Sequence, residues 1–230
     1  MQLVNLDNNI RKPKYLSPLN MMVAVLWIIC IVSQNRLVSV EGVTYISAAV
    51  IPYPFLCILF DIIAELYGYK ESRKTLWMAF VCIYLFVISV FLFAKLPSPN
   101  FWQQMSQTYD GEMSPLLRIL FFNSISFVIG QYINIYFFSK LRAIFNGKFF
   151  GLRSIGSTLI GDTITFAIAI LGDFSGLIKS HSLVAMIIDE LVIMYLMAII
   201  LAVPVSYLVS VLKKNEPDFD MSVRFNPFKK

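Results

Sequence analysis

The fold is decided by the stretch from Ile51 to Arg73, IPYPFLCILFDIIAELYGYKESR, an apolar helical pattern that ends at a Tyr-Gly-Tyr turn. Asp61 and Glu65 are four residues apart, so both carboxylates lie on one face of this helix. An acid at the centre of a membrane helix costs about 2.5–3.5 kcal/mol to insert. Asp61 is therefore a candidate functional residue, whereas Glu65 lies close enough to the end of the apolar run to be an interfacial charge instead.

The composition of the chain predicts an integral membrane protein. Of its 230 residues, 58% are hydrophobic and 14% are charged, whereas soluble domains carry about 25% charged residues. The formal charge of +5 comes from basic residues that flank apolar runs, which argues against a nucleic-acid partner. Cys30, Cys57 and Cys82 fall within apolar segments and suit neither a disulfide framework nor a metal site. We expect no cofactor and no bound metal.

The apolar runs predict an all-α membrane protein with six transmembrane helices. The spans are expected at about residues 19–33 with an extension to 37, 45–66, 75–94, 115–141, 154–172 and 182–212. We expect a cytoplasmic N-terminal segment at residues 1–18, a transmembrane domain at 19–212 and a cytoplasmic tail at 213–230. The turn-rich segment 95–114 is expected to be the one long loop.

Two prolines fall in the first half of the second expected span, at Pro52 and Pro54. Proline removes a backbone hydrogen bond and frees carbonyl groups, which membrane proteins tolerate only where protein or water covers them. The pair therefore predicts either a discontinuous helix that faces a cavity or an ordinary kink at the helix entry.

The basic residues predict the orientation of the chain in the membrane. Fifteen of the nineteen Lys and Arg residues lie in the N-terminal segment, the turn after the second span, the loop between the fourth and fifth spans, and the tail. The positive-inside rule then places both termini in the cytoplasm.

On this topology, polar side chains from three helices lie at one depth. Asp61, Gln131, Asn134 and Asp162 are each about 9–15 Å from the cytoplasmic side. Gln131 and Asn134 are three residues apart and either share a binding face or hold helices together, at about 0.6 kcal/mol for each interhelical hydrogen bond. A polar layer with aromatic walls is what a midplane substrate site in a transporter requires.

The chain resembles the queuosine precursor transporters, a family also described as vitamin uptake transporters. The resemblance is carried by Ser33-Gln34-Asn35, Asp61-Ile-Ile-Ala-Glu65-Leu-Tyr67-Gly68 followed by Arg73, Gly130-Gln131-Tyr-Ile-Asn134, Arg153-Ser-Ile-Gly-Ser157-Thr158 and Pro204. It implies a six-helix fold like that of the substrate-binding components of energy-coupling-factor transporters. It also implies a bacterial inner-membrane protein that imports a 7-deazaguanine, such as the 7-cyano or 7-aminomethyl form.

The polar layer and this resemblance together imply a set of substrate-binding residues: Asn35, Asp61, Glu65, Gln131, Asn134, Ser157 and Asp162. A carboxylate can accept two parallel hydrogen bonds from the pairing edge of a 7-deazaguanine while an amide serves its carbonyl. An aminomethyl cargo would need a second carboxylate for its cation. Arg73 and Arg153, at the cytoplasmic membrane edge, either anchor the helices, or one of them pairs with Glu65 or Asp162 to gate inner access.

Other function classes stay open from the sequence. The chain could be a substrate-capturing subunit that docks to an ATP-driven module, or an assembly protein. An intramembrane enzyme could use Asp61 and Asp162 as an acid pair, or could add Glu65 and Asn134 to them as a metal site. However, His181 is the only histidine and no protease or hydrolase signature appears, so we expect no enzyme. The expected partners are a small heterocycle and the bilayer, and a homo-oligomer stays open.

Overall fold

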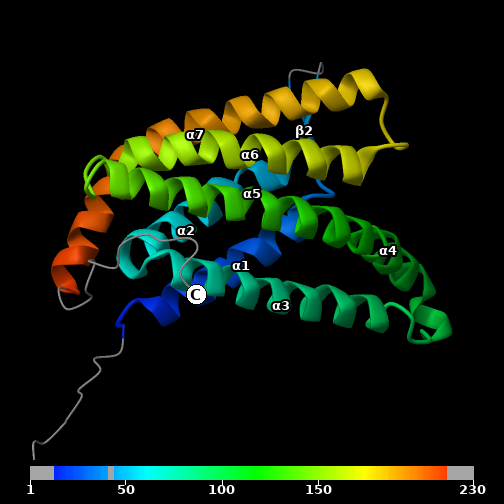
Figure 1. Ribbon diagram of the computed structural model, residues 1–230. Coiled ribbons are helices and arrows are strands. Elements are labelled where there is room, and N and C mark those ends of the chain that lie inside the picture. The colour runs from blue at the N-terminus through cyan, green and yellow to red at the C-terminus, as the bar shows by residue number, and fades with distance from the viewer. Residues whose placement is uncertain (1–12, 41–43, 217–230) are drawn as a thin grey trace, which may run out of the picture.

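The structure, a computed structural model, describes residues 13–40 and 44–216 (Figure 1). It consists of helices and one short antiparallel β-hairpin. The elements are α1 (Leu16–Ser33), β1 (Leu37–Val40), β2 (Thr44–Ser47), η1 (Ala48–Val50), α2 (Tyr53–Tyr67), α3 (Tyr69–Phe93), η2 (Asn100–Trp102), α4 (Gln103–Met113), α5 (Leu116–Ile144), α6 (Phe150–Phe174) and α7 (Ser180–Asn215).

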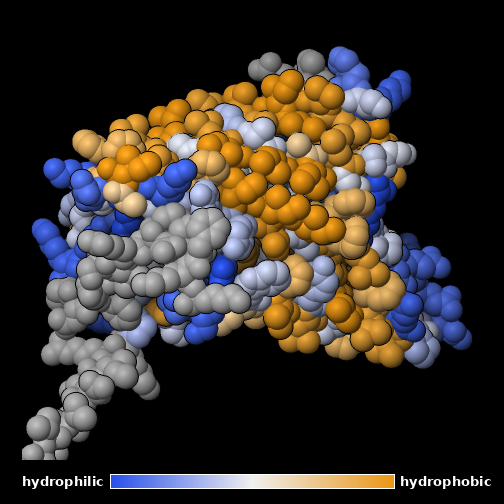
Figure 2. Space-filling model, in the orientation of Figure 1, coloured by the Kyte–Doolittle hydropathy of each residue, from blue (hydrophilic) through white to orange (hydrophobic). Residues whose placement is uncertain are grey.

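Within the described residues, six helical segments are long and apolar enough to cross a membrane. They are residues 16–33, 48–67, 69–93, 100–144, 150–174 and 180–215. Figure 2 shows a broad band of apolar side chains over these helices, with hydrophilic side chains at both ends. Large apolar side chains such as Leu85, Ile200 and Val203 are exposed, which suits contact with lipid. The protein is therefore a multi-pass membrane protein, as its composition predicts.

The second span, α2, is the centre of the bundle. Every residue from Leu59 to Leu66 is buried, and α2 contacts α1, α3, α5, α6 and α7. A helix that is apolar on all sides is stable where other helices surround it, and Asp61 and Glu65 are carried into the interior with it. Gly68 ends α2 with a φ of +85°, a backbone conformation that residues with a side chain rarely adopt. The turn at Gly68 lets α3 begin at the next residue.

The helices α5 and α6 pack closely because glycines face each other. A Cβ atom on Gly130 would lie 2.6 Å from the carbonyl oxygen of Gly161, and one on Gly161 would lie 2.7 Å from that of Gly130. Small residues let membrane helices approach in this way. The contact sets the positions of Asn134 on α5 and Asp162 on α6, which are each one turn or less from it.

The two ends of the bundle differ in composition. At one end, Lys14 donates its backbone N–H to Glu216 at 2.5 Å, so the two ends of the described chain lie close together. The last part of α7 turns toward this end after Pro204, which removes a helix hydrogen bond and bends the helix (Figure 1). We call this end of the bundle the basic end because Lys14, Arg142, Arg153 and Lys213 lie there. The β-hairpin marks the opposite end, here called the hairpin end.

Several expectations about single elements were wrong. The extension of the first span ends at Leu37 in strand β1, and the expected start of the second span at Tyr45 lies in strand β2. The two strands pair because both are rich in β-branched and apolar residues. Pro52 and Pro54 do not interrupt a long helix. They stand at the start of α2, where the missing N–H groups cost nothing.

The expected long loop at residues 95–114 is largely helical, with η2 and α4. The other helices extend a few residues beyond their expected ends, and α7 continues through Lys213 to Asn215, past the expected start of the tail. Most of the expected N-terminal segment 1–18 and tail 213–230 lies outside the described residues.

Candidate functional site

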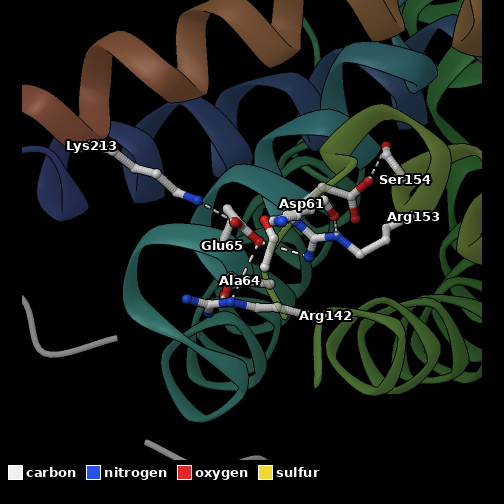
Figure 3. Close-up of polar contacts among 9 residues, drawn as sticks. Asp61, Ala64, Glu65, Arg142, Arg153, Ser154 and Lys213 are labelled. Carbon is white, nitrogen blue, oxygen red and sulfur yellow. Dashed lines mark hydrogen bonds and ion pairs between the residues drawn. The ribbon is translucent and has the colours of Figure 1, made fainter. Parts of the chain in front are cut away.

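At the basic end, Glu65 is surrounded by three cationic side chains (Figure 3). Arg153 donates a hydrogen bond from NH1 to Glu65 Oε2 at 2.9 Å, and both side chains are fully buried. Arg142 Nε lies 3.6 Å from the same oxygen, and Lys213 donates to Oε1. The Arg153 guanidinium also donates to the carbonyl oxygens of Gly147 and Lys148. This network ties α2 to α6, α5 and α7.

One turn deeper on α2, Asp61 accepts hydrogen bonds on both oxygens. Asn134 donates to Oδ1 at 3.3 Å, and Ser154 donates to Oδ2. Asp61 and Asn134 are buried, so the contact brings together two of the predicted site residues from α2 and α5. We call Asp61, Glu65, Asn134, Arg142, Arg153, Ser154 and Lys213 together the basic-end cluster.

Buried polar atoms without hydrogen-bond partners lie near this cluster, on α5 and α6. Within the described chain, both amide atoms of Gln131, Oδ1 of Asn134 and Oδ2 of Asp162 have no partner. The other oxygen of Asp162 accepts from the hydroxyl of Tyr53 at 3.1 Å. Native structures leave few buried polar groups unpaired, which makes these side chains candidates for contact with a polar cargo.

A narrow pocket opens from Tyr53 toward the hairpin end. Its wall is aromatic, and its polar side chains come from four different spans. The lining residues are Trp27, Cys30, Ile31, Gln34, Ala49, Val50, Tyr53, Leu56, Asn123, Phe127, Thr165, Phe166, Ala169 and Glu190. We call it the hairpin pocket. The rings of Trp27 and Phe127 are 4.3 Å apart, and those of Tyr53 and Phe166 are 5.1 Å apart.

The polar side of the hairpin pocket is built around the hairpin residue Ser47. Its backbone N–H donates to Glu190 Oε1 at 2.6 Å, and its hydroxyl donates to the side chain of Gln34 at 3.2 Å. Behind the lining, Asp173 accepts hydrogen bonds from Asn123 and Gln34. The hairpin therefore holds two lining residues in place.

The other predicted site residues are less closely connected. Asn35 is half-buried beside Gln34, at the hairpin end and away from Asp61. Ser157 is buried and donates to the backbone of its own helix at Ser154. Arg73 is exposed and contacts Tyr69 and Tyr132, with no ion pair to Glu65 or Asp162 in the described structure.

The sequence analysis missed the polar residues that line or support the hairpin pocket. They are Gln34, Ser47, Asn123, Asp173 and Glu190. Asp173 and Glu190 each lie near an end of an apolar run, where a charge is ordinary. The partners of these acids, the amides of Asn123 and Gln34 for Asp173 and the backbone N–H of Ser47 for Glu190, are distant in sequence and become neighbours only in the folded chain. Within residues 13–40 and 44–216, no group of three or more His, Cys, Asp or Glu side chains could hold a metal ion.

Comparison with known proteins identifies the family. Residues 47–209 match the family model described as "Putative vitamin uptake transporter". The chain belongs to this family. It is also 29% identical over 128 residues to the "Probable queuosine precursor transporter" of Bacillus subtilis (strain 168). That match covers 53% of this chain and 55% of the relative, about half of each. No solved structure matches the chain.

Proposed function

We propose that this family member imports a queuosine precursor, a 7-deazaguanine, across the bacterial inner membrane. The observation that carries the proposal is the hairpin pocket, an aromatic-walled site with few polar groups enclosed among membrane spans. The family description and the printed name of the Bacillus relative support the same class of cargo and describe transporters, not enzymes.

The lining of the hairpin pocket suits a flat heterocycle. Trp27, Phe127 and Phe166 offer ring faces on which a purine-like ring can stack, at about 1–3 kcal/mol for each stacked base. Glu190 and Asn123 offer oxygen atoms to the hydrogen-bond donors of such a cargo. The pocket is narrow in this conformation, so binding requires movement of the hairpin or of a neighbouring helix.

The predicted site residues form the next part of the path toward the basic end. The hydroxyl of Tyr53 connects the floor of the pocket to Asp162. The unpaired atoms of Gln131, Asn134 and Asp162 follow, and they would receive the cargo once it passes Tyr53. Asp61 lies at the inner boundary of this path.

The basic-end cluster would close the path on the other side. The ion pair between Arg153 and Glu65 joins α6 to α2, and Lys213 adds α7, so that separating these helices requires breaking buried charged contacts. This assigns Arg153 a gating role, with the basic end in the cytoplasm. Arg73, which has no such contact, would serve as an interfacial anchor.

Reconstitution tests the function most directly. Proteoliposomes that contain only this protein should take up radiolabelled 7-deazaguanines, whereas a capture subunit would need a co-purified ATPase. Trp27→Leu should lower uptake, and Trp77→Leu should not, since Trp77 is exposed on α3. Absence of both binding and uptake of 7-deazaguanines would contradict the proposal.

Reporter fusions test the orientation. A cytoplasmic reporter at Lys230 should be active, and a periplasmic reporter within residues 103–111 should be active, because six spans with a basic cytoplasmic side place them on opposite sides. An active periplasmic reporter at the C-terminus would overturn this topology.

A further inference from the structure

Glu190 presents a free carboxylate oxygen inside the hairpin pocket. The residue lies on α7, is 1% exposed and lines the pocket. Its Oε1 accepts the backbone N–H of Ser47 at 2.6 Å, which fixes the orientation of the side chain. Its Oε2 has no hydrogen-bond partner within the described residues. Burying a carboxylate with one oxygen unpaired is costly, so the site is arranged for a group that the protein does not supply.

The rest of the polar lining also presents acceptors. Asn123 uses its amide N–H₂ on Asp173, which leaves its carbonyl oxygen as its free group. Gln34 likewise donates to Asp173, at 3.4 Å. The hydroxyl of Tyr53 donates to Asp162. The amide groups of Asn123 and Gln34 and the hydroxyl of Tyr53 are therefore already engaged by carboxylates.

The protein itself places no cation beside Glu190 in the pocket lining, because none of the lining residues is Lys, Arg or His. Arg118 donates its hydrogen bonds to the carbonyl oxygens of Gly172 and Ser175, at 2.9 and 2.6 Å. The second carboxylate, Asp173, lies behind the wall, where Arg118 interacts with it electrostatically, so Glu190 is the carboxylate that lines the pocket. The pocket is thus built for a donor-rich, positively charged group.

We propose that Glu190 is the counterion for an ammonium group on the heterocycle, so that the pocket prefers the 7-aminomethyl form over the 7-cyano form. The inference rests on the proposed function and names the substrate within its class. An ammonium offers three N–H donors and a charge to Glu190 Oε2 and to the carbonyl oxygen of Asn123. A nitrile offers only an acceptor, which would face the carboxylate without a hydrogen bond.

Binding of the two 7-deazaguanines to the purified full-length protein tests this assignment. The wild type should bind the aminomethyl form at least about tenfold more tightly than the cyano form. Glu190→Gln keeps the acceptor for Ser47 and should remove that preference by weakening only the aminomethyl form. Asp189→Asn, the neighbouring neutralisation on α7 outside the pocket lining, should keep the wild-type preference.

Other binding results would contradict either the assignment of Glu190 or the proposed function itself. Equal binding of both forms by the wild type overturns the inference and leaves the proposed function standing. An equal loss for both forms in Glu190→Gln also overturns it, because Glu190 would then contact the shared pairing edge. Binding of neither form by the wild type overturns the proposed function as well. The preference for the aminomethyl form is measured on the wild-type protein, so the inference can be tested even if Glu190→Gln folds poorly.

Discussion

Glu65 and Glu190 are both buried carboxylates within membrane spans, yet their surroundings differ. Glu65 is 0% exposed and contacts Arg153, Arg142 and Lys213, so both of its oxygens are paired with cations of the protein. Glu190 has one backbone partner at Ser47 and faces a pocket whose lining contains no basic residue. The two sites are at opposite ends of the bundle.

This difference separates a structural charge from a binding charge. A buried ion that the protein pairs on every side holds helices together, and removing one partner leaves the others uncompensated. A buried ion that the protein pairs on one side only retains affinity for a ligand. The same residue type therefore predicts opposite results at the two ends, a loss of stability at the basic end and a loss of binding at the hairpin end.

The largest effect is expected from Glu65→Gln. The change leaves Arg153, which is fully buried, without a carboxylate, and breaking a buried pair costs about 3–5 kcal/mol. Thermal unfolding in detergent should show a large decrease in stability and in yield. Glu71→Gln is the matched control, since Glu71 pairs with Lys74 at an exposed site and such pairs contribute about 0–1 kcal/mol. Equal stability of Glu65→Gln and Glu71→Gln would contradict the structural role of the Glu65 charge at the basic end.

A smaller effect is expected from Gly130→Ala, which tests the contact that positions Asn134 and Asp162. The new Cβ would lie 1.8 Å from Thr165 Oγ1 and 2.6 Å from the backbone of Gly161, so α5 and α6 must separate. Overpacking of this kind costs about 1–3 kcal/mol. Gly156→Ala, whose Cβ would have its nearest neighbour at 3.8 Å, should melt like the wild type. A wild-type melting temperature for Gly130→Ala would show that the helix contact is not tight.

The sequence predicted the features that depend on local pattern. Long apolar runs locate six spans, and the i, i+4 spacing of Asp61 and Glu65 places both acids on the enclosed helix α2. The sequence predicted a common depth for Asp61 and Asn134, and in the structure the two side chains share a 3.3 Å hydrogen bond. These features follow from helix geometry and hydrophobicity alone.

Most features that depend on tertiary contacts could not be predicted. The sequence raised a pairing of Arg73 or Arg153 with an acid, but nothing local distinguishes Arg153, which pairs with Glu65, from Arg73, which stays exposed. Glu190 and Ser47 are 143 residues apart, and only the docking of the hairpin on α7 makes them neighbours. The hairpin itself occupies a stretch whose hydrophobicity suits the end of one span and the start of another.

Asp61→Asn should separate binding from transport. In this conformation both oxygens of Asp61 are taken by Asn134 and Ser154, so replacing one acceptor by an N–H₂ group should cost about 0.5–1.5 kcal/mol of stability. Because Asp61 does not line the hairpin pocket, cargo affinity should stay within about threefold, or about 0.7 kcal/mol, of the wild type. Uptake into proteoliposomes should fall further than affinity. A tenfold loss of affinity would place Asp61 in the primary site.

The smallest effect is expected from Arg73→Lys. Arg73 donates a hydrogen bond to the hydroxyl of Tyr132 at 3.4 Å and lies over the ring of Tyr69, and a lysine can replace these contacts at an exposed site. Stability should change by no more than about 0.5 kcal/mol. Arg153→Lys is the informative counterpart, because all three guanidinium nitrogens of Arg153 donate hydrogen bonds and one ammonium cannot reach the same acceptors in that geometry. Uptake and melting temperature should therefore fall in Arg153→Lys and stay near wild type in Arg73→Lys, whereas unaltered uptake and correct insertion in both variants would reject a gate at the basic end.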